Sequence, residues 1–294
     1  MKKATVRGFT SDRISGYLYI APAVALFAVF QIYPIIKTAV LSFQEFVGTA
    51  FVPVGVKNYI ELFTSGVFGR SLVNSTLFVA INMPLILVFT LFVAYRIHRA
   101  HRTLLGFYRI AFYLPSVASI VTVSVVWKNL LNPVTGLVNY LLGLVGVAPV
   151  IWLGQGYAFG SLCLILFTVN VGMSLILYIS AMQNVPAALT EAALIDGAGK
   201  GRVFFSIILP LVMPTTLFVV VINTINLFQS FALVNLMTKG GPYYATSTIV
   251  FQIYDTAFWL QRYGLASAMG IVLGLIIAVV SIVQVRIVNW DFEY

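Results

Sequence analysis

Charged side chains are unusually scarce in this sequence. Only 9% of its 294 residues are Asp, Glu, Lys or Arg, whereas an ordinary soluble domain carries roughly 25%. Hydrophobic residues make up 61%, and the mean hydropathy is +1.01. A soluble fold of this length needs a polar surface that so few charges cannot supply. The composition therefore predicts an integral membrane protein.

Cysteine and histidine are nearly absent. Cys163 is the single cysteine, so no intrachain disulfide can form. The only histidines, His98 and His101, lie in a basic segment without Cys or carboxylate neighbours, which makes a poor metal site. The sequence also offers no nucleophile with an accompanying base and no paired carboxylates. We therefore expect no catalytic residue, no metal and no cofactor bound by this chain.

Acidic residues are fewer than basic ones, with 8 Asp and Glu against 17 Lys and Arg, for a net charge of +9. The basic residues stand in short patches between apolar runs, as in membrane proteins, rather than in an aromatic-laced stripe that binds nucleic acid. We expect membrane lipid as a partner and no nucleic acid.

A self-sufficient secondary transporter would need carboxylates inside its spans, and the apolar runs contain essentially none.

Six apolar segments are long enough to cross a bilayer, which takes about 20 residues. They cover residues 16–43, 71–95, 108–130, 158–182, 211–237 and 266–288. The expected fold class is therefore all-α, a polytopic membrane protein with about six transmembrane helices. Two glycine pairs with GxxxG spacing predict close helix contacts, which small residues permit. These pairs are Gly156 with Gly160, and Gly270 with Gly274.

The placement of Lys and Arg predicts the orientation. The basic residues of the N-terminus, of the loops after the second and fourth spans, and of the C-terminal tail fall on one side. They form a larger and tighter set than those on the other side. The positive-inside rule places this set, and with it both termini, in the cytoplasm. Segments 46–68 and 132–157 would then lie outside.

The loop over residues 183–210, between the fourth and fifth spans, is more than a plain connector. Ala188, Ala192 and Ile195 recur at helical spacing and would form a small, smooth face. Gly197 is suited to end this helix, because glycine adopts the left-handed conformation at low cost. Such a short helix could dock on another protein or lie on the membrane surface. The pattern alone favours neither.

The same loop carries a longer set of residues at characteristic spacing. These are Glu191, Ala192, Ala193, Asp196, Gly197, Ala198, Phe204, Phe205, Ile207, Leu209, Pro210 and Pro214. At this spacing they resemble the EAA signature of permease subunits of binding-protein-dependent ABC importers. Segments 236–242, 246–248 and 263–268 resemble the carbohydrate-uptake branch of that family. So does Leu114-Pro115 followed by Trp127, Asn132 and Gly136.

The resemblance covers about residues 70 to 290 and is closest to the first permease of the maltose and glycerol-phosphate uptake branch. Together with the apolar segments, it predicts three ranges: a cytoplasmic segment 1–15, a first span and external loop 16–70, and a permease core 71–290 with its EAA loop at 183–210. It also implies that the chain forms half of a sugar or oligosaccharide path in a bacterial or archaeal cytoplasmic membrane. The alternatives are a glycerol-phosphate permease and a secondary transporter.

The resemblance further implies which partners the chain has. They are a second permease, two cytoplasmic ATPase subunits and an extracellular or periplasmic substrate-binding protein. A partner subunit would bind and hydrolyse ATP, and this chain would not be an enzyme. The EAA loop would dock on the ATPase and convert its closure into movement of the spans. The ATPase-coupling residues carried over are Glu191, Ala192, Ala193, Asp196, Gly197 and Ala198.

Polar residues inside two spans are candidates for the substrate path, because intramembrane polar groups are costly and often functional. They are Asn170, Ser174 and Tyr178 in the fourth span, and Asn223, Asn226, Gln229 and Ser230 in the fifth. Amides and hydroxyls suit sugar hydroxyl groups, and Phe228 and Phe231 could stack on a sugar ring. The alternative is hydrogen bonding between helices. No Lys or Arg lies in the middle of a span, which favours a neutral sugar over a phosphate-bearing substrate.

Overall fold

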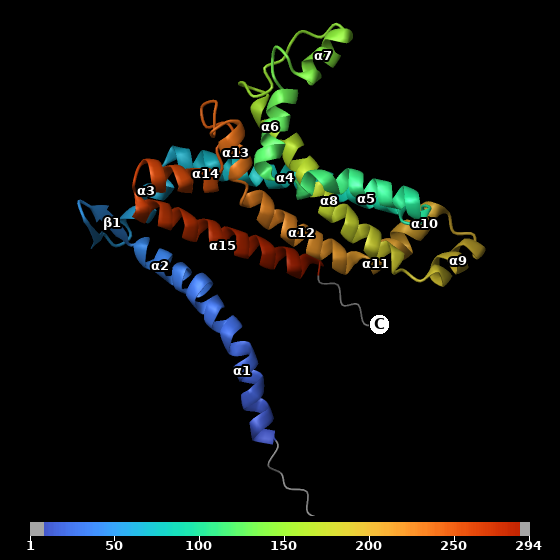
Figure 1. Cartoon of the computed structure of the whole chain (residues 1–294), viewed down its shortest axis with the longest axis horizontal. Helices are drawn as coiled ribbons and strands as arrows, with labels where there is room; N and C mark the ends of the chain where they lie inside the picture. The colour runs from blue at the N-terminus through green and yellow to red at the C-terminus, as the bar shows by residue number, and fades with distance from the viewer. Residues whose placement is uncertain (1–8, 289–294) are drawn as a thin grey trace, which may run out of the picture.

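The computed structural model describes residues 9–288, with side chains over 17–287 (Figure 1). Residues 1–8 of the expected cytoplasmic segment lie outside this range. The long helices are α1 (Phe9–Phe27), α2 (Tyr33–Leu41), α4 (Gly66–Ile97), α5 (Arg102–Val117), α6 (Ile120–Leu130), α8 (Ala158–Gln183), α12 (Met213–Phe228) and α15 (Tyr263–Val288). The described chain is therefore dominated by helix.

Short elements connect these helices. The helical ones are α3 (Lys57–Thr64), α7 (Leu137–Leu144), α9 (Ala187–Ile195), α10 (Lys200–Val203), α11 (Leu209–Leu211), α13 (Ala232–Met237) and α14 (Ile249–Tyr254). Three π-helical turns, η1 (Ala28–Ile32), η2 (Phe204–Ile208) and η3 (Asp255–Trp259), lie between helices. The described strands are β1 (Gln44–Val47) and β2 (Ala50–Pro53), an antiparallel hairpin.

Five segments of the described chain are long and apolar enough to cross a membrane. They are Tyr17–Leu41, Gly66–Ile97, Ala158–Gln183, Met213–Met237 and Tyr263–Ile287. A sixth candidate is the pair α5 and α6, which is bent by 99°. The expected all-α, polytopic architecture is confirmed, with five or six spans by length and composition.

The sequence did not reveal the bend in the third expected span, 108–130. Helix α5 ends at Val117, and Ala118 and Ser119 are extended. The Ser119 hydroxyl accepts a hydrogen bond from the backbone N–H of Val121 at 3.4 Å, so α6 begins with its own N-cap. Residues 108–130 therefore form two helices rather than one straight span, because a capping serine restarts the helix in a new direction.

Helices α4, α5, α8, α12 and α15 form the bundle. Helix α8 packs along α4 and α5, and α12 contacts α4, α8 and α15. In Figure 1 these helices run across the view, with α9 beyond one end and the β-hairpin at the other. We call these the α9 end and the hairpin end. Helix α6 and the segment that carries α7 project sideways from the bundle.

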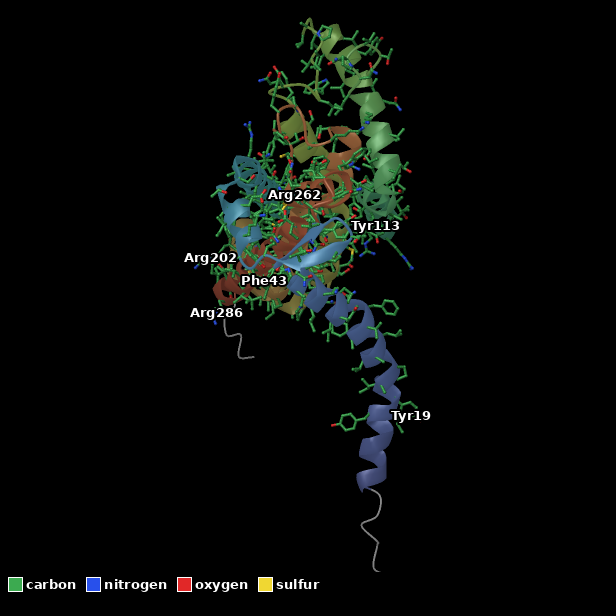
Figure 2. All side chains as sticks on the ribbon, turned by 90° about the vertical axis from the view of Figure 1, so that its left-hand side faces the viewer. Tyr19, Phe43, Tyr113, Arg202, Arg262 and Arg286 are labelled. Carbon is green, nitrogen blue, oxygen red and sulfur yellow. The ribbon has the colours of Figure 1, made fainter. Side chains whose placement is uncertain are left out.

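The first span leaves the bundle. Helix α2 contacts α15, whereas α1 points away from the other helices in both views (Figures 1 and 2). Tyr19 on α1 is 86% exposed, and none of the most apolar stretch of Tyr17–Leu41 is buried within the chain. Lipid or another protein chain must therefore cover this apolar helix.

The hairpin end is held together by polar contacts. The Asn58 side-chain amide donates to the backbone oxygens of Ser42 at 2.9 Å and Gln44 at 2.8 Å. Arg262, just before α15, forms a two-pronged ion pair with Glu61 of α3. The hydrogen bonds from Arg262 hold the pKa of Glu61 below its usual value. These contacts join the hairpin, α3 and the start of α15.

Helices α5 and α8 approach each other closely at Gly172 of α8. A Cβ atom there would overlap the backbone of Phe112 and Tyr113 and the hydroxyl of Ser116, all in α5. The two GxxxG pairs make no such approach, because a Cβ on any of their four glycines would have nothing within 4 Å. The expected close contacts at these pairs are therefore not found within this chain. Gly156 instead adopts φ +90°, which favours glycine in the loop before α8.

Candidate coupling loop and polar span faces

The α9 helix presents an apolar surface outside the bundle. The small face expected from Ala188, Ala192 and Ile195 is exposed, and Ile195 is 86% exposed. Leu189 and Leu194 add to this surface at 47% and 48% exposure. Sequence reasoning missed these two leucines because they do not share the alanine spacing. An apolar surface at the end of a bundle is typical of a docking site.

The six expected coupling residues divide into two groups. Glu191, Ala192, Asp196 and Gly197 are exposed, so a partner can reach them. Ala193 and Ala198 are half-buried and pack against the hydrophobic cluster at the α9 end of the bundle. We therefore expect these two alanines to seat the helix rather than to contact a partner.

Gly197 ends α9 as the sequence predicted. It adopts φ +81°, in the left-handed region. Its N–H donates to the oxygen of Leu194 at 3.1 Å, and the N–H of Ala198 donates to the oxygen of Ala193 at 2.9 Å. This pair of bonds is the Schellman motif, and the Ala193 and Ala198 side chains lie in the same hydrophobic cluster. The turn after α9 is therefore sharply defined.

The two polar span faces, expected as separate features, meet in the interior. The side-chain amide of Asn223 in α12 donates to the hydroxyl of Ser174 in α8 at 3.0 Å and to the oxygen of Val219 at 2.8 Å. Asn223 is 4% exposed, Ser174 is 1% exposed and Tyr178 is fully buried. For these three residues the arrangement favours hydrogen bonding between helices.

The other path candidates are more accessible. Asn226 and Gln229 are exposed, and Ser230 lies half-buried where α12 ends before α13. Asn170 is half-buried, and its amide donates to the oxygen of Leu166 at 2.7 Å. An exposed amide on a span is costly against lipid, so we expect Asn226 and Gln229 to face a polar passage or another chain.

The two phenylalanines proposed to stack on a sugar have different surroundings. Phe228 is only 2% exposed and packs in the core at the hairpin end, so the expectation that it presents its ring to a sugar is wrong. The next residue, Gln229, is exposed instead. Phe231 is half-buried, with its ring centroid 4.8 Å from that of Tyr254.

The spans carry no acidic residue. None of the five segments that could cross a membrane contains Asp or Glu. Over the described residues, no group of three or more His, Cys, Asp or Glu side chains could hold a metal ion. The fold thus defines a multi-pass membrane protein with an exposed, largely apolar helix, α9, at one end of its bundle.

Comparison with known proteins identifies the family. Residues 86–290 match the family described as "Binding-protein-dependent transport system inner membrane component". The lactose transport system permease protein LacF of Rhizobium radiobacter is 31% identical over 277 residues, which cover 92% of this chain and 93% of LacF. The sn-glycerol-3-phosphate transport system permease protein UgpA of Yersinia pestis is 28% identical over 281 residues, covering 95% of each chain.

Solved structures share the fold. A chain of a bacterial ABC transporter that imports the acidic polysaccharide alginate superposes with a TM-score of 0.85 at 23% identity, covering 98% of this chain and 100% of that chain. A structure of the alginate transporter in complex with an alginate pentasaccharide-bound periplasmic protein gives a TM-score of 0.84, also at 23% identity. It covers 96% of this chain and 97% of that chain.

The chain therefore belongs to the family of binding-protein-dependent transport system inner membrane components, the permease subunits of ABC importers. It is a multi-pass protein of the inner membrane. The family expected from the EAA spacing is confirmed. The roles of individual residues remain predictions.

Proposed function

We propose that this chain forms one half of the path of an ATP-driven importer for a sugar or oligosaccharide, and that α9 docks on a separate ATPase. The observation that carries the proposal is the exposed apolar surface of α9, which ends in the Schellman turn at Gly197. This surface lies outside the spans, so the hydrocarbon core of the bilayer does not cover it. A docking partner that pushes on α9 could move the spans.

The orientation of the chain in the membrane follows from the basic residues at the α9 end. Arg96 lies in the last turn of α4, Arg99 in the loop after it and Arg102 at the start of α5. Lys200 and Arg202 of α10 lie at the same end. The positive-inside rule then places the α9 end in the cytoplasm and the hairpin end outside. The first span would begin in the cytoplasm and α15 would end there, so both termini would be cytoplasmic.

The substrate class is inferred from the relatives and from the span composition. LacF is named for lactose and UgpA for glycerol-3-phosphate. A phosphate-bearing substrate favours Arg or Lys along its path, and none lies near the middle of a described span. A neutral sugar is therefore the better fit, and a glycerol-phosphate substrate is the alternative.

The proposal implies a complex. We infer a second permease, which would cover part of the exposed first span, and two ATPase subunits, one of which would contact α9. A substrate-binding protein would bind at the hairpin end. ATP would be bound and hydrolysed by the ATPase subunits, with no catalytic step in this chain.

The proposal is tested by co-expressing the chain with the products of neighbouring genes and reconstituting the purified complex in vesicles. We expect uptake of a sugar that requires ATP, the binding protein and every subunit. Uptake by the purified chain alone, without any ATPase, would instead establish a secondary transporter. Labelling of a cysteine introduced at Ile195 from the outside of intact cells would contradict the orientation.

Asn226 and Asn223 give a matched pair for the substrate path. Asn226→Ala should raise the KM for uptake about two- to tenfold, the effect of one lost hydrogen bond, because Asn226 is exposed on α12. Asn223→Ala should instead lower the melting temperature with little change in KM, because its bond to Ser174 is buried. Uptake assays and thermal unfolding of both variants check this. An unchanged KM for Asn226→Ala would place the path elsewhere.

A further inference from the structure

Helix α9 has a single buried residue, Thr190, which is 2% exposed. The hydroxyl of Thr190 donates to the oxygen of Ala187 at 2.8 Å and accepts a hydrogen bond from Arg99 Nη2 at 2.6 Å. Arg99 belongs to the short loop after α4, 91 residues earlier in the sequence. A guanidinium group from a different loop therefore holds the inner side of the docking helix.

A second contact joins the end of α4 to the exit from α9. The hydroxyl of Tyr95, in the last turn of α4, donates to the backbone oxygen of Lys200 at 3.1 Å. The Tyr95 ring lies with its centroid 4.8 Å from that of Phe204. The loop after α4 therefore contacts α9 itself, through Arg99 and Thr190. The last turn of α4 contacts the segment after α9, through Tyr95 and Lys200.

A third contact lies just before α9. The side chain of Gln183, the last residue of α8, donates to the backbone oxygen of His98 at 3.3 Å. It also accepts a hydrogen bond from Arg109 Nη2 at 3.0 Å. All three contacts reach the same corner between α4 and α5. Among them, Arg99 is the only one that reaches α9 itself.

These contacts matter because α9 has little other support. Its main contact with another helix is with the four-residue helix α10, and Ala193 is its one side chain packed against the hydrophobic cluster of the bundle. Pro186 precedes it, and glycines at 197, 199 and 201 follow it. Without a tie, a force on the outer face of α9 would tilt the helix about these ends instead of moving the bundle.

Helix α4 is suited to carry that force across the membrane. Its 32 residues correspond to a length of about 48 Å. At the hairpin end, the amide of Asn74 donates to the oxygens of Tyr244 at 2.9 Å and Ser247 at 3.0 Å, and Ser75 accepts from the N–H of Ile249 at 3.0 Å. The same helix thus contacts the docking helix at one end and the loop before α14 at the other.

We propose that Arg99 is a positioning residue that ties α9 to α4, so that α4 is the span moved first when a partner pushes on α9. The proposal rests on the proposed function of α9 as the ATPase-docking helix. It adds the residue that transmits the movement and the span that receives it. Loss of the tie would leave docking and ATP hydrolysis intact, but less substrate would be transported for each ATP hydrolysed.

The test measures substrate transported per ATP hydrolysed by the complete reconstituted complex. Arg99→Ala and Thr190→Val should each lower this ratio about fivefold or more, while the ATPase subunits still co-purify and hydrolyse ATP. Thr190→Ser keeps the hydroxyl and should retain the ratio. Arg99→Lys should fall between, because lysine cannot reproduce the rigid guanidinium geometry.

Arg102→Ala is the matched control, since it removes one positive charge three residues away and Arg102 is exposed. Its ratio should equal that of the wild type. The double variant Arg99→Ala/Thr190→Val should be no worse than either single variant, because both remove the same hydrogen bond.

Outcomes for the tie and for the proposed function differ. A normal ratio for Arg99→Ala in a complex that hydrolyses ATP overturns the tie and leaves docking at α9 intact. If Arg102→Ala lowers the ratio of transport to ATP hydrolysis as much as Arg99→Ala does, the cause is the loss of positive charge at this corner. That result also overturns the tie. If no ATPase subunit co-purifies with any variant or with the wild type, the proposed function itself is overturned.

Discussion

Replacing Gly197 with proline should abolish transport and leave the chain in the membrane. Gly197 has φ +81°, whereas proline fixes φ near −65°. Proline would also remove the N–H that donates to Leu194 at 3.1 Å, one of the two bonds that end α9. A proline at a position whose conformation it cannot adopt costs more than about 1 kcal/mol. The mismatch should be relieved locally, because a Cβ at this position meets nothing within 4 Å.

The expected result is a displaced docking helix on an otherwise intact bundle. The measurement is uptake by whole cells beside the amount of chain in the membrane fraction, with co-purified ATPase as a further readout. We expect normal amounts of chain, loss of the ATPase subunit and no uptake. Uptake at the wild-type rate would show that the geometry of α9 does not matter and would contradict the docking role.

Gly199→Pro provides a matched control two residues away. Gly199 has φ −68° and ψ 158°, which proline adopts without strain. A Cβ there also meets nothing within 4 Å. This variant should transport at close to the wild-type rate. A loss equal to that of Gly197→Pro would mean that any proline in the turn disrupts it, and the left-handed conformation would no longer be the reason.

The end of α9 was predictable because its signal is local. An Asp-Gly pair after an alanine face indicates a helix end through the conformational preference of glycine alone. The family was predictable for a similar reason, since the EAA residues stand close together in the sequence. The long apolar runs likewise predicted the spans, because crossing a bilayer needs only length and hydropathy.

Features that depend on contacts between distant residues were not predictable. Asn223 and Ser174 were placed on separate faces, because helical spacing gives the face of each helix but not which helices meet. Arg99 looked like one more orienting charge, although its hydrogen bond to Thr190 gives it a specific partner. Gly172 lies in the fourth span, where nothing in the sequence marks it off from the glycines of the GxxxG pairs.

Gly172→Ala should strongly destabilise the bundle for this reason. The new methyl group would overlap the α5 backbone at Phe112 and Tyr113, and backbone cannot rotate away as a flexible side chain can. The Ser116 hydroxyl, which donates to the oxygen of Val169 at 2.5 Å, would also have to move. Overpacking of this kind costs about 1–3 kcal/mol. It more than offsets the gain of about 1 kcal/mol that alanine brings to a helix.

Gly274→Ala in α15 is the control with the opposite expected sign, because a Cβ there meets nothing within 4 Å. Thermal unfolding in detergent or nanodiscs should show a lower melting temperature for Gly172→Ala and an equal or higher one for Gly274→Ala. Helix α5 also carries Arg109, which bonds Gln183 just before α9. Separation of α5 from α8 should therefore lower the transport-to-ATP ratio as well as stability. Equal melting temperatures for the two variants would refute the close approach at Gly172.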